Sequence, residues 1–155
     1  MIIGVISDTH GLLRPQALAA LGGSELIIHA GDVGDPEILK WLEEIAPVTA
    51  VRGNIDVAAW ALALPETAVL DADGKQIYIL HDLNQLDLKP EAAGFAAVIS
   101  GPSHVPLQRT EEGVLYFNPG SAGPRRFNLP VSVGKLRIDG KEIKAEVITF
   151  ESVET

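Results

Sequence analysis

Five short apolar runs along the chain are each followed, within a few residues, by a polar side chain that can bind a metal ion. The first run, 2–6, is rich in β-branched residues and predicts a buried strand. Because ligand sites in open α/β sheets lie beyond the carboxyl ends of the strands, the recurrence predicts one site at one sheet edge. The polar residues that follow the runs are Asp8 and His10, Asp32, Asn54, His81 and His104.

Helical signals separate the first three runs. Pro15 in a first helical turn and the glycine pair that begins at Gly22 predict a helix over 15–21. Asp35 as N-cap and a proline after it open a second helix, which Pro47 ends. The strands between these helices are expected at 25–29 and 47–51, so the first half alternates between strands and helices.

Turn signals dominate the second half, where 71–74, 111–113 and 139–140 each predict a hairpin. A further buried run covers 96–100. A partly parallel start followed by antiparallel strands predicts an α/β chain with a mixed sheet or two packed sheets. The strands that flank the three turns are expected at 68–70 and 76–80, 105–109 and 114–117, and 131–138 and 141–150.

Composition narrows the class of protein. The length of 155 residues suits a single domain over 1–155, and no linker or repeat interrupts it. The formal charge of −9 argues against a groove for a nucleic-acid duplex, but bound cations would still allow a phosphorylated substrate. Without cysteine, any metal must use His, Asp, Glu or Asn. We expect no signal peptide and no membrane span, and therefore a cytoplasmic protein.

Each candidate motif is weak by itself. In an extended segment Asp8 and His10 would point to one side, although such a pair is more often a turn or a helix cap. His81 and His104 could each be a hydrogen-bonded structural histidine, and His29, inside an apolar run, is expected to make a core hydrogen bond. Together the carboxylates, imidazoles and amide form a mixed oxygen and nitrogen set that suits Mn²⁺, Fe or Zn²⁺.

The order of these motifs resembles the calcineurin-like metallophosphoesterase superfamily, and within it the small, single-domain YfcE-type phosphodiesterases. The resemblance implies a mixed-sheet β-sandwich flanked by helices and a centre that holds two divalent metal ions. Mn²⁺ is expected first, with Fe, Zn²⁺ and Ni²⁺ as alternatives. The blocks that carry the resemblance are Asp8-Thr9-His10, Gly31-Asp32 with Asp35, Gly53-Asn54-x-Asp56, His81, Gly101-x-x-His104 and Asn118-Pro119-Gly120-Ser121.

The resemblance also implies a role for each residue. One metal would be held by Asp8, His10, Asp32 and His104. The second metal would share Asp32 as a bridge and use Asn54 and His81. Asn54 and Asp56 are the catalytic candidates, and a metal-bound hydroxide would attack the phosphorus atom. The candidates for substrate binding are Arg14, Asn118, Arg125 and Arg126, although the arginines could equally be ordinary surface charges.

Three positions depart from the family pattern. Pro102 replaces a histidine that would bind the second metal, so this site is expected to be weaker. Ile55 stands where some members carry a histidine that acts as general acid. Asp82 replaces a glycine after His81, and we expect it to be a hydrogen-bond partner of a ligand in preference to a ligand itself.

The expected function is hydrolysis of a phosphodiester or another small phosphorylated substrate. Diesters fit better than monoesters because no dedicated general acid is visible. The alternative is a catalytically weak or inactive scaffold for protein interaction, since the small retromer subunit also resembles this family and fold alone does not establish catalysis. A homo-oligomer remains an open possibility.

Overall fold

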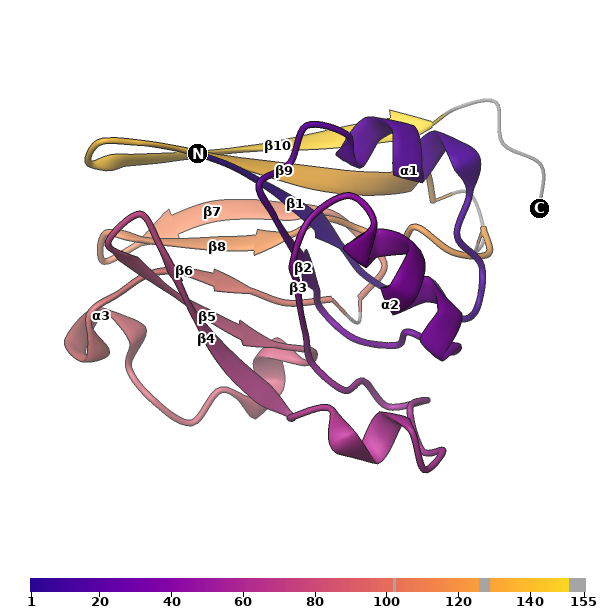
Figure 1. Cartoon of the computed structure of the whole chain (residues 1–155). Helices are drawn as coiled ribbons and strands as arrows, with labels where there is room; N and C mark the ends of the chain where they lie inside the picture. Colours follow the sequence, from indigo (N-terminus) through magenta and orange to yellow (C-terminus); the bar gives the residue numbers. More distant parts are fainter. Residues whose placement is uncertain (102, 126–128, 151–155) are drawn as a thin grey trace.

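Two β-sheets pack face to face, with helices outside them, in the computed structural model (Figure 1). It describes residues 1–101, 103–125 and 129–150. Within these residues the strand orders are β10-β9-β1-β2-β3 and β4-β5-β6-β8-β7. The elements are β1 (Ile2–Ile6), α1 (Pro15–Leu21), β2 (Leu26–His29), α2 (Pro36–Glu43), β3 (Val48–Ala50), η1 (Ala61–Ala63), β4 (Thr67–Ala72), β5 (Lys75–Leu80), η2 (Leu83–Gln85), α3 (Pro90–Ala93), β6 (Phe95–Ile99), β7 (Leu107–Glu111), β8 (Val114–Asn118), β9 (Val131–Asp139) and β10 (Glu142–Phe150).

The first sheet is covered on its outer face by α1 and α2. Leu21 of α1 and Leu42 of α2 are fully buried in one apolar cluster with Ile6 and Ile27 of the sheet. Gly4 of β1 allows this approach, because a Cβ there would lie 2.7 Å from a methyl group of Leu21. The apolar runs of β1 and β2 are continuous, and their successive residues point alternately to the two faces, so both faces of the sheet are buried.

A second apolar cluster fills the space between the sheets. Ile3 and Val5 of β1 meet Ile79 of β5 and Phe117 of β8, all without exposed surface. The outer face of the second sheet is covered by the segment that includes η2 and α3, through a third cluster around Tyr78. This layering confirms the α/β prediction of a mixed-sheet sandwich flanked by helices. None of the helices in the described part of the chain has the length and apolar character needed to cross a membrane.

The prediction of antiparallel pairing in the second half was partly wrong. β5 pairs with β6 in parallel, and β6 pairs with β8 in parallel. The hairpin of β9 and β10 joins the first sheet, where β9 lies antiparallel to β1. The short helix α3, which we did not predict, begins at Pro90 and ends at Gly94, whose φ of 84° is left-handed. It belongs to the connection that returns the chain for parallel pairing.

The parallel pairing brings five strand ends to one edge of the sandwich. β1, β2 and β3 run parallel in the first sheet, and Ile6 stands opposite His29 in the register. β5 and β6 run parallel in the second sheet. Backbone hydrogen bonds continue between the loops that follow the strands. The Gly31 carbonyl accepts from Asp8 N–H at 3.0 Å, and the His81 carbonyl accepts from Gly101 N–H at 2.8 Å.

Candidate metal centre

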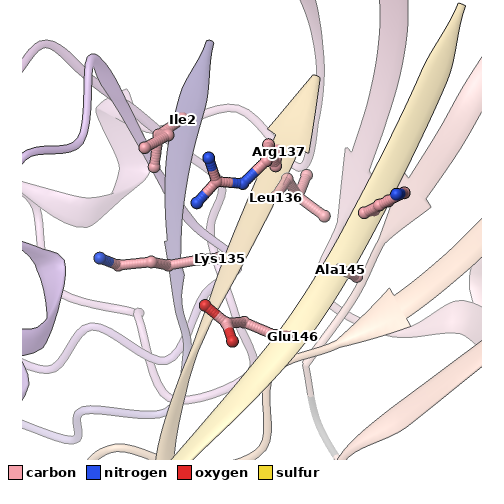
Figure 2. A pocket seen from close by; sticks show the side chains of 7 residues that line it. Ile2, Lys135, Leu136, Arg137, Ala145 and Glu146 are labelled. Atoms are coloured by element: carbon pink, nitrogen blue, oxygen red, sulfur yellow. The ribbon is translucent and has the colours of Figure 1, made fainter. Parts of the chain in front are cut away.

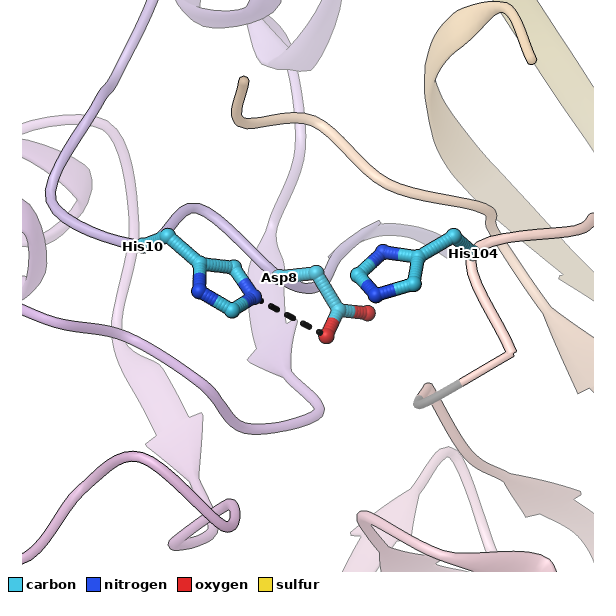
Figure 3. A group of neighbouring side chains, drawn as sticks. All are labelled: Asp8, His10 and His104. Carbon is cyan, nitrogen blue, oxygen red and sulfur yellow. Dashed lines mark ion pairs between the residues drawn. The ribbon is translucent and has the colours of Figure 1, made fainter. Parts of the chain in front are cut away.

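Five of the six predicted ligands form two overlapping clusters at this edge. Asp8, His10 and His104 make one, and Asp8, Asp32 and His81 make the other. In each cluster the ligand atoms lie within 4.8 Å of one another. His10 and His104 lie on either side of the Asp8 carboxylate, with ring centroids 5.8 Å apart (Figure 3). The structure thus brings together side chains from both sheets.

The carboxylates of Asp8 and Asp32 each lie near two histidines, His10 of the first cluster and His81 of the second. Asp32 Oδ2 lies 3.5 Å from His10 Nε2 and 3.3 Å from His81 Nε2. Asp8 Oδ1 lies 3.7 Å from His10 Nε2 and 4.0 Å from His81 Nε2. Oxygen atoms placed between two imidazoles in this way suit a carboxylate that serves two cations.

The other polar atom of Asp8, of Asp32 and of His81 is held by the protein. Asp32 Oδ1 accepts from Ile55 N–H at 3.1 Å, and Asp8 Oδ2 accepts from the Ser7 hydroxyl at 2.9 Å. His81 Nδ1 lies 2.7 Å from the Ala30 carbonyl oxygen. Because a carbonyl only accepts, Nδ1 carries a ring proton, so Nε2 is the nitrogen that can bind a cation or a second proton beside the carboxylates.

Burial and charge move the pKa values of these groups apart. Burial raises the pKa of Asp8 to about 7. Burial acts in the same direction on Asp32, but the interaction with His81 outweighs it and lowers the pKa of Asp32 to about 2. The two carboxylates in turn raise the pKa of His81, against the effect of its burial. Both raised pKa values favour protonation of Asp8 and His81, and a bound cation would compete with these protons.

The residues present fit a divalent cation. Asp8 Oδ1 and His81 Nε2 are buried and have no hydrogen-bond partner in the described part of the chain. A buried polar atom without a partner is costly, and a metal ion would satisfy both. The carboxylate and imidazole donors suit Mn²⁺, Fe or Zn²⁺.

The backbone at the candidate ligands is strained. Asp8, His10, Asp32 and His104 have φ values of 56°, 48°, 58° and 59°, in the left-handed region. Non-glycine residues rarely adopt this conformation, and they do so chiefly at functional sites and tight turns. The extended segment that we expected for Asp8 and His10 is therefore wrong, because β1 ends at Ile6 and the left-handed loop aims both side chains.

Asn54 lies at the side of the centre. It is exposed and, with His81, lines a cavity of about 450 Å³. The sequence alone did not indicate this cavity, because its walls come from the β3–β4 connection, β5 and the segment after His81. Its other lining side chains include Arg52, Glu66, Tyr78, Gln85 and Asp87.

Asp56, predicted as a catalytic group, is occupied by the backbone. It is 2% exposed, and its carboxylate accepts from the N–H groups of Val33 at 3.1 Å, Gly34 at 3.0 Å and Gly53 at 2.9 Å. These contacts give Asp56 a positioning role, while its catalytic role stays a prediction. It ties the loop that carries Asp32 to the loop that carries Asn54.

Asn118, predicted to bind substrate, is likewise engaged within the chain. Its amide nitrogen donates to the Ser103 hydroxyl at 3.1 Å, and its oxygen accepts from Gly120 N–H at 2.9 Å. It thus holds the segment next to His104, and its role in substrate binding stays a prediction. Asp82 accepts from Asn84 N–H at 3.0 Å and caps η2.

The predicted arginines differ in their surroundings. Arg14 is buried and donates to the Gly123 carbonyl at 3.3 Å, and Gly123 N–H donates to the Asp8 carbonyl at 3.1 Å. Arg14 is therefore connected to the centre. Arg125 is exposed. Arg126 and Pro102 lie outside the described residues.

A second hollow, of about 190 Å³, lies on β1, β9 and β10 and contains none of the candidate ligands. Lys135, Arg137 and Glu146 project over this part of the first sheet (Figure 2). Side chains of mixed charge on a sheet surface are ordinary solvated groups, and we assign this hollow no part in the chemistry.

Comparison with known proteins identifies the family. Residues 1–141 match the calcineurin-like phosphoesterase superfamily domain. The chain belongs to this superfamily. A probable metallophosphoesterase of Methanothermobacter thermautotrophicus is 38% identical over 160 residues, which span 96% of this chain and 92% of the relative. The resemblance noted in the sequence is thereby confirmed.

Solved structures agree on the fold of this metallophosphoesterase. A novel archaeal phosphodiesterase superimposes with a TM-score of 0.80 at 24% identity, over 96% of this chain and all of the other. YfcE, a phosphoesterase from E. coli, gives a TM-score of 0.67 at 23% identity, over 88% of each chain. At these identities the likeness concerns the fold.

Proposed function

We propose that the chain hydrolyses phosphodiesters with two divalent cations held by the six predicted ligands. The observation that carries the proposal is the pair of buried carboxylates, Asp8 and Asp32, each facing His10 and His81. When bound, the cations would neutralise the phosphoryl oxygens and activate a water molecule for attack on phosphorus. The proposed ligands are Asp8, His10, Asp32, Asn54, His81 and His104.

The protein groups would act by holding and orienting. We assign the bridge to Asp32, since its Oδ2 lies nearer to both histidines than Asp8 Oδ1 does. The exposed amide of Asn54, at the edge of the cavity, would donate to a phosphate oxygen and orient the ester. Arg14 would add positive charge near the Asp8 end.

Diesters suit this centre better than monoesters. Ile55 cannot donate a proton to a leaving alcohol, so substrates whose alcohol leaves as a stable anion would react most readily. The cavity beside His81, at about 450 Å³, is of the size that holds one organic substituent. A diester carries two such substituents around one phosphate.

The assay is hydrolysis of bis(4-nitrophenyl) phosphate with and without added Mn²⁺. We expect turnover that requires the ion, stops with a chelator and exceeds that of 4-nitrophenyl phosphate. Fe²⁺, Zn²⁺ and Ni²⁺ added in place of Mn²⁺ would identify the preferred cation. A folded, metal-loaded protein that hydrolyses neither ester would refute the proposal.

The scaffold alternative would rest on the groove between α1 and α2, which is lined by apolar side chains that include Leu13 and Trp41. Trp41 is 46% exposed there. We favour the enzyme, because a scaffold needs neither buried carboxylates without full partners nor strained backbone at four ligands.

A further inference from the structure

His29, the last residue of β2, is fully buried and hydrogen-bonded at both ring nitrogens. Gly31 N–H donates to Nδ1 at 3.1 Å. Nε2 lies 3.0 Å from the Thr9 hydroxyl oxygen, and this hydroxyl donates to the Val33 carbonyl at 2.8 Å. The prediction of a core hydrogen bond is confirmed, but the partners show more than packing.

The chemistry of the end groups fixes the direction of these bonds. A backbone N–H only donates, so Nδ1 must carry a lone pair and the single proton of a neutral ring lies on Nε2. Nε2 therefore donates to Thr9, whose own proton goes to a carbonyl that only accepts. Burial favours the neutral ring as well, because it lowers the pKa of His29 to about 4.

The partners of His29 flank the candidate ligands. Thr9 stands between Asp8 and His10, while Gly31 and Val33 stand on either side of Asp32. The chain of bonds thus crosses from the loop after β1 to the loop after β2. It continues into the third loop, because Val33 N–H donates to Asp56, which also accepts from Gly53 N–H next to Asn54.

These loops need an internal tie. Asp8, His10 and Asp32 adopt the strained left-handed conformation. This strain favours opening of the loops. A buried network with every donor and acceptor matched resists that opening and specifies a single arrangement.

We propose that His29 is a positioning residue of the metal centre. It donates to Thr9 and accepts from Gly31, and so holds the loops of Asp8, His10 and Asp32 at the spacing that cations require. The inference rests on the proposed function insofar as that centre binds divalent metal. Groups behind metal ligands commonly alter metal affinity or activity by about 10–100-fold when they are replaced.

Matched variants at Thr9 and at His29 test the hydrogen bond between these two side chains. Thr9→Val removes the hydroxyl at nearly constant shape, whereas Thr9→Ser keeps it. His29→Gln can place an amide N–H where Nε2 lies, whereas His29→Asn can place an oxygen where Nδ1 lies but cannot reach Thr9. We expect Thr9→Val and His29→Asn to bind Mn²⁺ about 10–100-fold more weakly in calorimetric titration, and Thr9→Ser and His29→Gln to keep most of the affinity.

If His29 only stabilised the fold, its variants would behave like the loss of any other buried hydrogen bond. Ser24→Ala is the control, because the Ser24 hydroxyl is also buried and donates to the Leu21 carbonyl at 2.7 Å, away from the ligands. It should lower the melting temperature without changing metal affinity. In the Thr9→Val, His29→Asn double variant the loss of Mn²⁺ affinity should be no larger than in the weaker-binding of the two single variants, because both substitutions remove the hydrogen bond between His29 and Thr9.

Kinetics supply a second measurement. At saturating Mn²⁺ the Thr9→Val and His29→Asn variants should show a lower kcat for the diester with little change in KM. Equal metal affinity in wild type and in both variants, with only the melting temperature lowered, would overturn the inference. So would additive losses in the double variant.

Failure of the inference can be told from failure of the proposed function. A wild type that binds Mn²⁺ but hydrolyses no diester would refute the function, while the affinity series would still decide the role of His29. A wild type that binds no divalent cation at all would overturn both.

Discussion

Asp32 Oδ2 lies 3.3 Å from His81 Nε2, although Asp32 follows β2 of the first sheet and His81 follows β5 of the second. The contact joins the two sheets at the edge where their parallel strands end. A cation bound between these atoms would therefore link both halves of the sandwich. Binding at such a position stabilises the folded chain as a whole, because the unfolded chain has no equivalent site.

The first prediction concerns this link. Mn²⁺ at one hundred times its dissociation constant should stabilise the wild type by ~2.7 kcal/mol, which raises the melting temperature by roughly 5–10 °C in a chain of this size. In Asp32→Asn the shift should nearly vanish, and hydrolysis of the chromogenic diester should fall by at least about 100-fold. Thermal unfolding with and without Mn²⁺ and the diester assay provide the two readouts.

Asp139→Asn, at the exposed end of β9, is the matched control, since it removes one carboxylate of the acidic surface. It should keep both the thermal shift and the activity. Unchanged activity in Asp32→Asn would mean that the hydrolysis arises elsewhere or from a contaminant.

Local signals predicted most elements of the fold. The helix over 15–21 was predicted with its observed bounds, because Pro15 begins it and Gly22 follows its last residue. Asp35 caps α2 through a bond from Glu37 N–H at 2.9 Å, as the Asp-Pro pair indicated. The sheet that accepts β9 could not be predicted, since its partner β1 lies more than a hundred residues away and no local pattern specifies it.

The candidate site divides in the same way. The five clustered candidate ligands could be predicted because each follows a strand, and parallel strands share an edge. The hydrogen-bond partners of Asp56 and Asn118 could not, since the Val33 N–H and the Ser103 hydroxyl become their neighbours only in the folded chain. The left-handed backbone at Asp8 also escaped prediction, because strand periodicity extends no further than Ile6.

The second prediction concerns Gly53. A Cβ at this position would overlap the Asp32 carboxylate and its backbone nitrogen. Since backbone cannot move aside cheaply, Gly53→Ala should displace the Asp32 side chain and weaken Mn²⁺ binding by at least about tenfold. Calorimetric titration measures this loss.

Gly22→Ala is the control for that variant, because Gly22 has an ordinary φ of −57° and its Cβ would meet one carbonyl at 3.2 Å. Its metal affinity should match the wild type. Equal affinity in Gly53→Ala would show that the loop after β3 shifts freely and that Asp32 is not held against it.

The third prediction concerns pH. Burial raises the pKa of Asp8 from 3.8 to about 7, so the metal-free folded chain holds a proton that the unfolded chain has released. The contribution of Asp8 to stability is therefore present below about pH 4 and is lost as pH rises to about 7. Asp8→Asn should raise the metal-free melting temperature at pH 8 by several °C and change it little at pH 4. In a chain of this size 1 kcal/mol corresponds to roughly 2–4 °C.

Metal binding should show the opposite pH trend. The pKa values of Asp8 and His81 are both raised, so a cation must displace protons to bind. Mn²⁺ affinity should fall as pH drops below about 7, and the binding enthalpy should depend on the ionisation enthalpy of the buffer. A pH-independent affinity between 5 and 8 would contradict the assignment of these residues as ligands.

The last prediction concerns Pro102, which stands where the family carries a histidine of the second site and lies outside the described residues. The first proposed site keeps Asp8, His10, Asp32 and His104, while the second keeps Asn54, His81 and the shared Asp32. Proline offers no side-chain donor, so water must complete the second site, and the second cation also binds against the charge of the first.

We therefore expect unequal occupancy, with one tight and one weak Mn²⁺ in calorimetric titration and activity that rises over a high range of metal concentration. Pro102→His should tighten the weak site by about 10–100-fold and increase turnover at limiting metal. Pro102→Ala is the control, because it also relaxes the fixed φ of proline but adds no ligand. Two equally tight sites in the natural sequence would show that another group has taken the place of the missing imidazole.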